Sequence, residues 1–440
     1  MCQKTGRMSA CAFLILMVTW ISESRANKFD FPAHLVGTNS SVTDGLESFI
    51  EQYNPVDLGV DMLDEEAPMH IKEALVNATL SHDPIINQMI PYKPLPRFAR
   101  ALAKFYSPLL GREVIAEEEM IATVGATGGV FDAIQGHTSP GDEWIIIQPA
   151  YTMYVPMIKM AHGVPRYTNL VLRKRSGKIS SQDWVLDREQ MESLFNNKTK
   201  GIILNNPLNP LGKVYTLEEL EFIAGLAKKY DTLVVSDEAH EFITHKPHIR
   251  IASLPGMWER TIAIGSSSKS FNVAGFRVGW AYGSANILNN LKAVHARAAD
   301  CAPFPQQQAL AVAFEQELRD IGNPNSFFEN HRRDILVKRN TMVEAFEKAG
   351  MRPIVPDGSF CLIADWTTLK SKPLWKTKDA GLDFVKWLVK NVGVFGLPVS
   401  SFYSEGHEYL GENFVRYCYQ KSYKTINTAV EKLRKLQKYR

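Results

Sequence analysis

The sequence predicts an α/β protein, with a mostly parallel sheet in a large domain and a smaller α+β domain after it. Between about residues 120 and 305, short apolar runs alternate with longer amphipathic helical patterns. This alternation is typical of a parallel sheet covered by helices on both faces. After about residue 325 it stops, and charged helical patterns surround a single strand pattern. A chain of 440 residues is long enough for two domains.

The expected strands of the large domain are apolar runs at residues 145–147, 201–204, 232–236, 261–265 and 277–281. A helix is expected at residues 216–229, because Leu220 and Ile223 fall on one side of it and Glu218 on the other. Parallel strands joined by helices have their carboxyl ends at one edge of the sheet, which is where α/β proteins bind ligands.

The C-terminal part predicts a charged amphipathic helix at residues 329–348, a strand at 358–363 and helices near 382–391 and 424–437. We therefore expect a large domain at residues 76–322 and a small domain at 323–440. Residues 27–75 show no sheet pattern of their own, so we expect them to pack with the small domain.

The N-terminus is typical of a secretory signal peptide at residues 1–26. Lys4 and Arg7 precede an apolar run that ends at Ile21, and small residues follow. The run is too short to span a bilayer comfortably. A start of translation at Met8 or Met17 remains an alternative, so the sequence leaves the compartment open.

Composition excludes several classes of partner and site. Lys and Arg number 50 against 47 Asp and Glu, giving a net charge of +3 without a block of one sign. This balance predicts neither nucleic-acid binding nor attachment to a membrane surface. The five cysteines form no CxxC pair, so neither a disulfide framework nor a metal site is expected.

Two predicted strands end in residues that suit pyridoxal 5′-phosphate chemistry. One ends at Asp237, and the other leads into Ser266 and Lys269, with Arg277 eight positions after the lysine. A lysine can form a Schiff base, an aspartate can pair with a pyridinium nitrogen, and hydroxyl and guanidinium groups can hold a phosphate.

Three further motifs lie at predicted strand ends. A glycine-rich loop at residues 124–131 precedes a helical pattern and could hold a phosphate at the positive end of the helix dipole. Tyr151 could stack on a flat ring, and Asn205 and Asn209 in an Asn-Pro segment could donate to a ring oxygen or a carboxylate. Each motif alone is weak, but their order along the chain makes coincidence a poor explanation.

The chain resembles the fold-type I pyridoxal phosphate aminotransferases, within them the animal kynurenine aminotransferase and glutamine transaminase K (cysteine-S-conjugate β-lyase) family. The resemblance runs from about residue 40 to the C-terminus and is most specific at residues 251–261, 266–269, 397–404 and 415–419. It implies a mostly parallel seven-stranded sheet, a homodimer with its site at the two-fold interface, and amino acid and 2-oxo acid substrates.

The resemblance also implies roles for single residues. Lys269 would form the Schiff base and move the proton, and Asp237 would pair with the pyridine nitrogen. Arg416 would bind the substrate carboxylate together with Asn209. The implied cofactor-binding residues are Ala126, Thr127, Tyr151, Asn205, Asn209, Asp237, His240, Ser266, Lys269 and Arg277.

Several positions depart from the family pattern. His240 stands where a tyrosine usually bonds the cofactor's ring oxygen, and we expect it to titrate near neutrality. Met89 replaces a tyrosine that the family lends to the partner subunit's phosphate, and Thr127 replaces another tyrosine. Asp61 brings a carboxylate near the expected place of substrate carboxylates and could change specificity. Residues 298–305 lack the Phe-His pair that lines the family's substrate pocket.

Three functions remain open at this point. The first is transfer of an amino group from an L-amino acid (kynurenine, glutamine, methionine or an aromatic one) to a 2-oxo acid in two half-reactions. The second is β-elimination from cysteine S-conjugates at the same site. The third is a non-catalytic descendant that binds the cofactor. Members of the family are usually cytoplasmic or mitochondrial, whereas the signal-like residues 1–26 suggest the secretory pathway.

Overall fold

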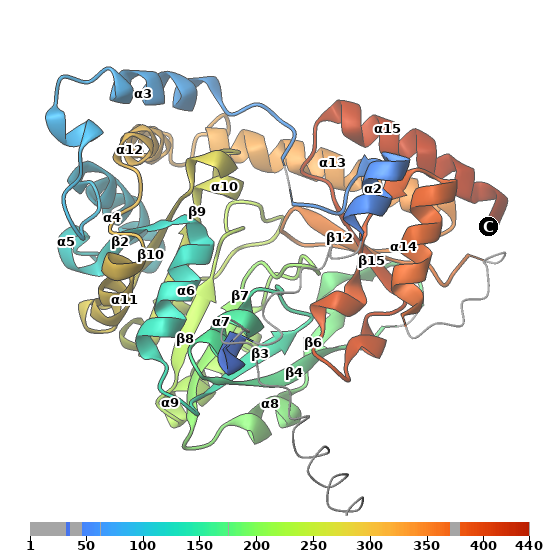
Figure 1. Ribbon diagram of the computed structural model, residues 1–440, viewed down its shortest axis with the longest axis horizontal. Coiled ribbons are helices and arrows are strands. Elements are labelled where there is room, and N and C mark those ends of the chain that lie inside the picture. The colour runs from blue at the N-terminus through green and yellow to red at the C-terminus, as the bar shows by residue number, and fades with distance from the viewer. Residues whose placement is uncertain (1–31, 36–45, 62, 175, 370–378, 440) are drawn as a thin grey trace, which may run out of the picture.

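The computed structural model describes residues 32–35, 46–61, 63–174, 176–369 and 379–439 (Figure 1). The expected signal peptide at residues 1–26 lies outside these ranges. In the described part of the chain, no helix combines the length and the apolar character needed to cross a bilayer.

A large sheet forms the centre of the molecule. Its strand order is β2 (Met120–Val124), β10 (Val278–Tyr282), β9 (Thr261–Ser266), β8 (Leu233–Asp237), β7 (Thr199–Asn205), β3 (Glu143–Gln148), β4 (Val164–Leu172) and β6 (Trp184–Leu186). All five expected strands are confirmed. The strands from β2 to β4 make the expected seven, and the short β6 extends the sheet by pairing antiparallel with β4.

One expected strand, β10, runs antiparallel to both of its neighbours, β2 and β9. The physical reason is the connection between β9 and β10, which covers only residues 267–277. A parallel return needs a crossover of a dozen or more residues. The remaining pairs from β9 to β4 are parallel, so β7, β8 and β9 end at the same edge.

Helices cover both faces of this sheet, because successive strand residues point to opposite sides. On β3, Ile146 packs with α6 (Gly125–His137), α7 (Tyr154–Met160) and α11 (Ala285–Ala298). Its neighbours Ile145 and Ile147 pack on the other face with α8 (Arg188–Leu194) and α9 (Leu217–Lys229). Farther along that face lie α4 (Pro96–Leu110) and α12 (Phe304–Arg319). Helix α9 begins with a capping box between Thr216 and Glu219, which confirms the expected helix there.

The second sheet has the order β14 (Leu397–Pro398), β15 (Phe414–Cys418), β12 (Cys361–Asp365), β11 (Arg352–Val355) and β5 (Ile179–Ser180). Its helices are α13 (Phe327–Ala349), α14 (Ala380–Asn391) and α15 (Tyr423–Leu433), drawn in orange and red in Figure 1. In the sequence, strand β5 lies between β4 and β6 of the large sheet, but it pairs with β11 of the second sheet. This pairing ties the two sheets together.

The N-terminal segment divides between the two sheets. Helix α2 (Glu47–Tyr53) lies beside α14, and β1 (Val56–Asp57) pairs with β13 (Val394–Phe395) (Figure 1). Helix α3 (Met69–Thr79) instead packs against α12, on the side of the large sheet. The expectation that all of residues 27–75 would pack with the small domain is therefore wrong for α3, whose buried Ile71 and Ala74 join the apolar core around α4 and α12.

Short helices complete the described chain. The remaining α-helices are α5 (Ala116–Glu119) and α10 (Ser267–Ser270). The 3-10 helices are η1 (Ala33–Leu35), η2 (Pro84–Asn87), η3 (Ser181–Asp183), η4 (Ile251–Ser253), η5 (Trp258–Arg260), η6 (Ala274–Phe276), η7 (Val399–Phe402), η8 (Glu408–Leu410) and η9 (Arg434–Tyr439). Helix α10 carries Lys269 directly after β9, which places this lysine at the carboxyl end of the strand.

Candidate active site

A cavity of about 220 Å³ lies at the carboxyl ends of β7, β8 and β9. It is lined by every residue that the sequence proposed for the site except Arg416, which lies behind the wall. These lining residues are Asp61, Ala126, Thr127, Tyr151, Asn205, Asn209, Asp237, His240, Ser266, Lys269 and Arg277. The strand register explains why these residues lie close together. Asn205 of β7 pairs with Asp237 of β8, and Asp237 pairs with Ile264 of β9.

Asp237 is buried at the last position of β8. Its carboxylate accepts a hydrogen bond of 2.5 Å from the Tyr154 hydroxyl and one of 3.1 Å from the Ala239 N–H. Burial raises the pKa of Asp237, although both hydrogen bonds act to lower it. Sequence analysis missed Tyr154. The sequence offers no signal for Tyr154 beyond its place three residues after Tyr151.

Lys269 reaches the cavity from α10. Its Nζ donates to the main-chain carbonyl of Asp61 at 3.0 Å and lies 4.4 Å from the centre of the Phe360 ring. Burial lowers the pKa of Lys269, against the attraction of the Asp61 carboxylate. A lowered pKa increases the neutral fraction of the amine, which is the nucleophilic form.

The glycine-rich loop differs from expectation, because the glycines do not precede a helix but form the start of α6. Gly125 is its first residue, with φ of +68°, a conformation that a side chain would strain. The N–H groups of the first turn have no partner within a helix, so Ala126 and Thr127 can present theirs to the cavity. A Cβ on Gly125 would also meet Arg277 Nη2 at 3.0 Å. The helix start and the guanidinium are thus packed together.

His240 requires a correction. It is buried, its ring meets Phe360 edge to face at 4.6 Å, and Nδ1 lies 3.4 Å from the Pro207 carbonyl and 3.3 Å from Ser359 Oγ. Burial, with Lys269 nearby, lowers the pKa of His240 to about 3. The expected titration near neutrality is therefore wrong, because desolvation disfavours the charged imidazole.

Arg416 of β15 is buried, with 2% of its surface exposed, and faces the cavity wall from behind. Its Nη1 donates to Asn209 Oδ1 at 3.1 Å, and its Nη2 donates to Asp61 Oδ1 at 2.6 Å and to the Gly59 carbonyl. The structure thus brings the three predicted substrate-binding residues together. It joins Arg416 to Asn209 and Asp61, both of which line the cavity.

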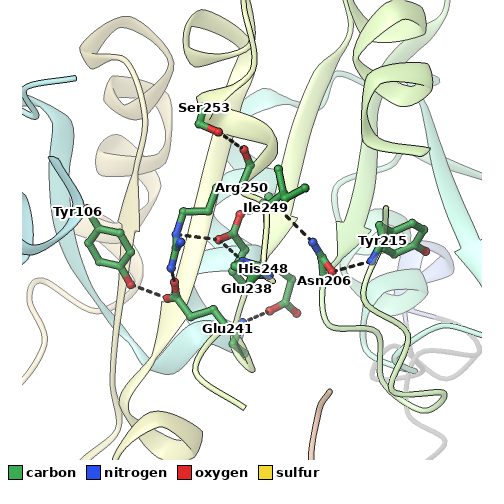
Figure 2. Close-up of polar contacts among 12 residues, drawn as sticks. Tyr106, Asn206, Tyr215, Glu238, Glu241, His248, Ile249, Arg250 and Ser253 are labelled. Carbon is green, nitrogen blue, oxygen red and sulfur yellow. Dashed lines mark hydrogen bonds and ion pairs between the residues drawn. The ribbon is translucent and has the colours of Figure 1, made fainter. Parts of the chain in front are cut away.

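A buried ionic network supports the chain just after Asp237 (Figure 2). Arg250 lies between the carboxylates of Glu238 and Glu241, and the Tyr106 hydroxyl donates to Glu241 at 2.5 Å. His248 Nε2 contacts Glu238 at 3.1 Å. Within the described ranges, Glu238, Glu241 and His248 are close enough to hold a metal ion, but the Arg250 guanidinium already supplies both carboxylates with a cation. Sequence analysis missed this network, because its partners meet only in the fold.

Comparison with known proteins identifies the family. Residues 53–433 match the model for aminotransferase class I and II. Kynurenine–oxoglutarate transaminase 3 of Mus musculus is 38% identical over 415 residues, covering 93% of this chain and 91% of that protein. Kynurenine–oxoglutarate transaminase 1 of Homo sapiens is 37% identical, covering 87% of this chain and 93% of that protein.

Solved structures agree. Bna3p of Saccharomyces cerevisiae, described as a putative kynurenine aminotransferase, superposes with a TM-score of 0.87 at 27% identity, covering 94% of this chain and all of that one. N-succinyldiaminopimelate aminotransferase of Mycobacterium tuberculosis gives a TM-score of 0.82 at 26% identity, covering 92% of this chain and 100% of that one.

These matches confirm the resemblance seen in the motifs and the fold-type I α/β architecture. They favour transamination over the two alternatives, β-elimination and a non-catalytic descendant. Enzymes of this family are in general dependent on pyridoxal phosphate. The chain therefore belongs to the class I and II aminotransferases and is an aminotransferase.

Proposed function

We propose that this enzyme holds pyridoxal 5′-phosphate in the cavity and moves an amino group from an L-amino acid to a 2-oxo acid there. The observation that carries the proposal is the convergence of Lys269 and Asp237 on one cavity, from the ends of the neighbouring strands β9 and β8. The names of the relatives make kynurenine the first donor to test and 2-oxoglutarate the first acceptor.

The residues present fit the cofactor. The start of α6, Ser266 and Arg277 line the cavity, with Arg277 packed beside Gly125, and would hold the phosphate, because N–H groups, a hydroxyl and a guanidinium all donate to an anion. Asp237 would pair with the pyridine nitrogen and Tyr151 would stack on the ring. Asn205 and Asn209 add amide groups to the same wall, and His240 lies beside them.

When bound, the cofactor supplies an electron sink for the charge that develops at the substrate's α-carbon. Lys269 would supply the amine that holds the cofactor and, once the substrate's amine has taken its place, the free Lys269 amine would move the proton to and from the α-carbon. Its lowered pKa suits this exchange at neutral pH. Asp237 would hold a proton on the pyridine nitrogen, and the Tyr154 hydroxyl, which donates to Asp237 Oδ2, orients the carboxylate for this.

Arg416 would receive the α-carboxylate of each substrate, with Asn209 holding its other side. A planar guanidinium can give a carboxylate two parallel hydrogen bonds, which a lysine cannot. The same residues would serve the amino acid and the 2-oxo acid in turn, since both carry that carboxylate.

A donor panel tests the proposal. Kynurenine, glutamine, methionine and phenylalanine are each incubated with 2-oxoglutarate, and the formation of glutamate is measured. Glutamate formed from at least one donor, in two half-reactions that can be run separately, supports the proposed transamination. Absence of glutamate from all donors, with cofactor bound, contradicts the proposed substrate class.

Arg416→Lys keeps the charge at this position but removes the planar guanidinium, which can give a carboxylate two parallel hydrogen bonds. Charge-assisted hydrogen bonds contribute about 1.5–3 kcal/mol, so we expect kcat/KM for the best donor to fall about tenfold to a hundredfold. Arg297→Lys on α11 is the matched control, because Arg297 lies over the ring of Tyr92, which is outside the cavity lining, whereas Arg416 contacts the lining residues Asn209 and Asp61. Loss of activity in Arg297→Lys and not in Arg416→Lys would reassign the carboxylate to Arg297.

We also propose a symmetric homodimer. Between the end of α3 and the loop after η2, four large apolar side chains are exposed in the single chain: Leu80, Ile85, Met89 and Tyr92. A second copy of the chain would cover them. Light scattering should give twice the mass of the chain. Met89 offers no useful donor, so Met89→Tyr should retain more cofactor through gel filtration if this segment reaches the partner's site. Equal retention would remove Met89 from that role.

A further inference from the structure

The carboxylate of Asp61 is paired with Arg416, the arginine to which we assign binding of the substrate's carboxylate. Asp61 Oδ1 lies 2.6 Å from Arg416 Nη2. Asp61 lines the cavity and its side chain is 29% exposed, whereas Arg416 does not line the cavity. A molecule that enters therefore meets a carboxylate first, and the guanidinium only behind it.

Asp61 is held in this place by more than the arginine. Its Oδ1 accepts a hydrogen bond from Cys418 Sγ at 3.2 Å. Burial would raise the pKa of the Asp61 carboxyl, but Arg416 and Lys269 bring this pKa below its usual value. The carboxylate thus stays charged at neutral pH, and the pair does not open by protonation.

The pairing leaves one nitrogen of Arg416 without a hydrogen-bond acceptor. Its buried Nε has no hydrogen-bond partner among the described residues. Elsewhere in the chain, Arg97 donates to Glu315 through Nε at 2.9 Å and through Nη2 at 2.7 Å, which is the two-bond geometry of a guanidinium edge with a carboxylate. On Arg416, the Nη2 half of the same edge is shared by Asp61 and the Gly59 carbonyl, and the Nε half has no partner among the described residues. A substrate carboxylate could use both halves, but only after Asp61 has left Nη2.

We propose that Asp61 is a specificity-determining residue whose carboxylate competes with the α-carboxylate of the substrate for Arg416. An amino acid binds by displacing Asp61 and gains the second hydrogen bond at Nε in exchange. A ligand without a carboxylate has no need to displace it. Asp61 therefore weakens the binding of carboxylates selectively. It reduces the difference in affinity between amino acids and amines that lack a carboxylate. This inference rests on the proposed role of Arg416.

The test is binding of an unreactive carboxylate to the holoenzyme. Calorimetry gives the Kd of 3-phenylpropionate, which carries a carboxylate but no amino group, and of 3-phenylpropionamide, its neutral analogue. In Asp61→Asn we expect the Kd of the acid to fall about tenfold to a hundredfold, the range of one charge-assisted hydrogen bond. The Kd of the amide should not change. The KM for phenylalanine, which carries the carboxylate, should fall in the same direction as the Kd of the acid.

Glu66→Gln is the matched control, because it removes the same charge five residues away. The Glu66 side chain is 87% exposed and pairs only with Lys72 among the contacts described. It should leave both Kd values unchanged. If Asp61→Asn tightens the acid no more than Glu66→Gln does, the competition is refuted.

A double variant separates competition from a general effect on the cavity. In an Arg416→Gln background, Asp61→Asn should no longer tighten binding of the acid, since contacting residues are not additive. Tightening that persists without Arg416 overturns the proposal. Should Asp61→Asn not fold, as judged by its melting curve, Asp61→Ser is measured in the same way. The binding assay needs no turnover, so a failure of the donor panel contradicts the proposed function without deciding this competition.

Discussion

Lys269→Ala is expected to abolish transamination while the protein remains folded. In the part of the chain that the structure describes, Lys269 is the lysine that lines the cavity, and its pKa is lowered by burial. Loss of proton transfer alone reduces kcat by about 100- to 10,000-fold, and loss of the attachment point adds to this. The measurement is glutamate formation from the best donor. A melting curve shows that the variant is folded, and the phosphate contacts should retain part of the cofactor.

Lys292→Ala is the control for this variant. Lys292 on α11 is half-buried, and burial also lowers its pKa, but its Nζ donates to the Glu118 carbonyl at 2.5 Å and does not line the cavity. Borohydride reduction of the wild type should fix the cofactor on Lys269. Cofactor fixed on Lys292, or full activity in Lys269→Ala, would contradict the assignment.

The sequence was sufficient where local pattern decides the structure. Strands β3, β7, β8 and β9 are short apolar runs between turn residues, and buried parallel strands have this composition. The ends of these runs therefore located Asp237 and Lys269 without knowledge of the fold. Strand β4 was missed, because its polar Arg166, Thr168 and Asn169 break the apolar pattern. Strand β4 is recognised in the structure by its parallel pairing with β3, which its sequence pattern does not predict.

The sequence was insufficient where a property depends on what packs around a residue. A histidine at position 240 suggested titration near neutrality, but its burial against Phe360 removes the water that a charged ring needs. Asp61 suggested repulsion of substrates, but not the direct pairing with Arg416, because the two residues are far apart in the chain. Tyr154 and Arg250 carried no recognisable motif, and their partners are identified only by the fold.

Asp237→Asn is expected to have the second largest effect. Asparagine keeps the shape of the side chain and can still accept a hydrogen bond from the Tyr154 hydroxyl, which now donates to Asp237 Oδ2 at 2.5 Å. The variant therefore removes mainly the charge. Loss of one partner from a buried ion pair costs about 3–5 kcal/mol, so we expect kcat to fall about a hundredfold to five-thousandfold. The Kd of the cofactor should rise as well, because its protonated nitrogen loses its counter-charge.

Two comparisons make this result specific to the charge at the end of β8. Asp231→Asn removes the same charge before the start of that strand, where Asp231 is exposed, pairs with Arg260 and has φ of +51°, a conformation that asparagine tolerates; its kcat should equal the wild type. Tyr154→Phe leaves the Asp237 charge but removes its orienting hydroxyl, so it should lower kcat less than Asp237→Asn does. If Asp237→Asn retains wild-type kcat and cofactor affinity, Asp237 does not pair with the pyridine nitrogen, and its burial at the strand end serves the fold alone.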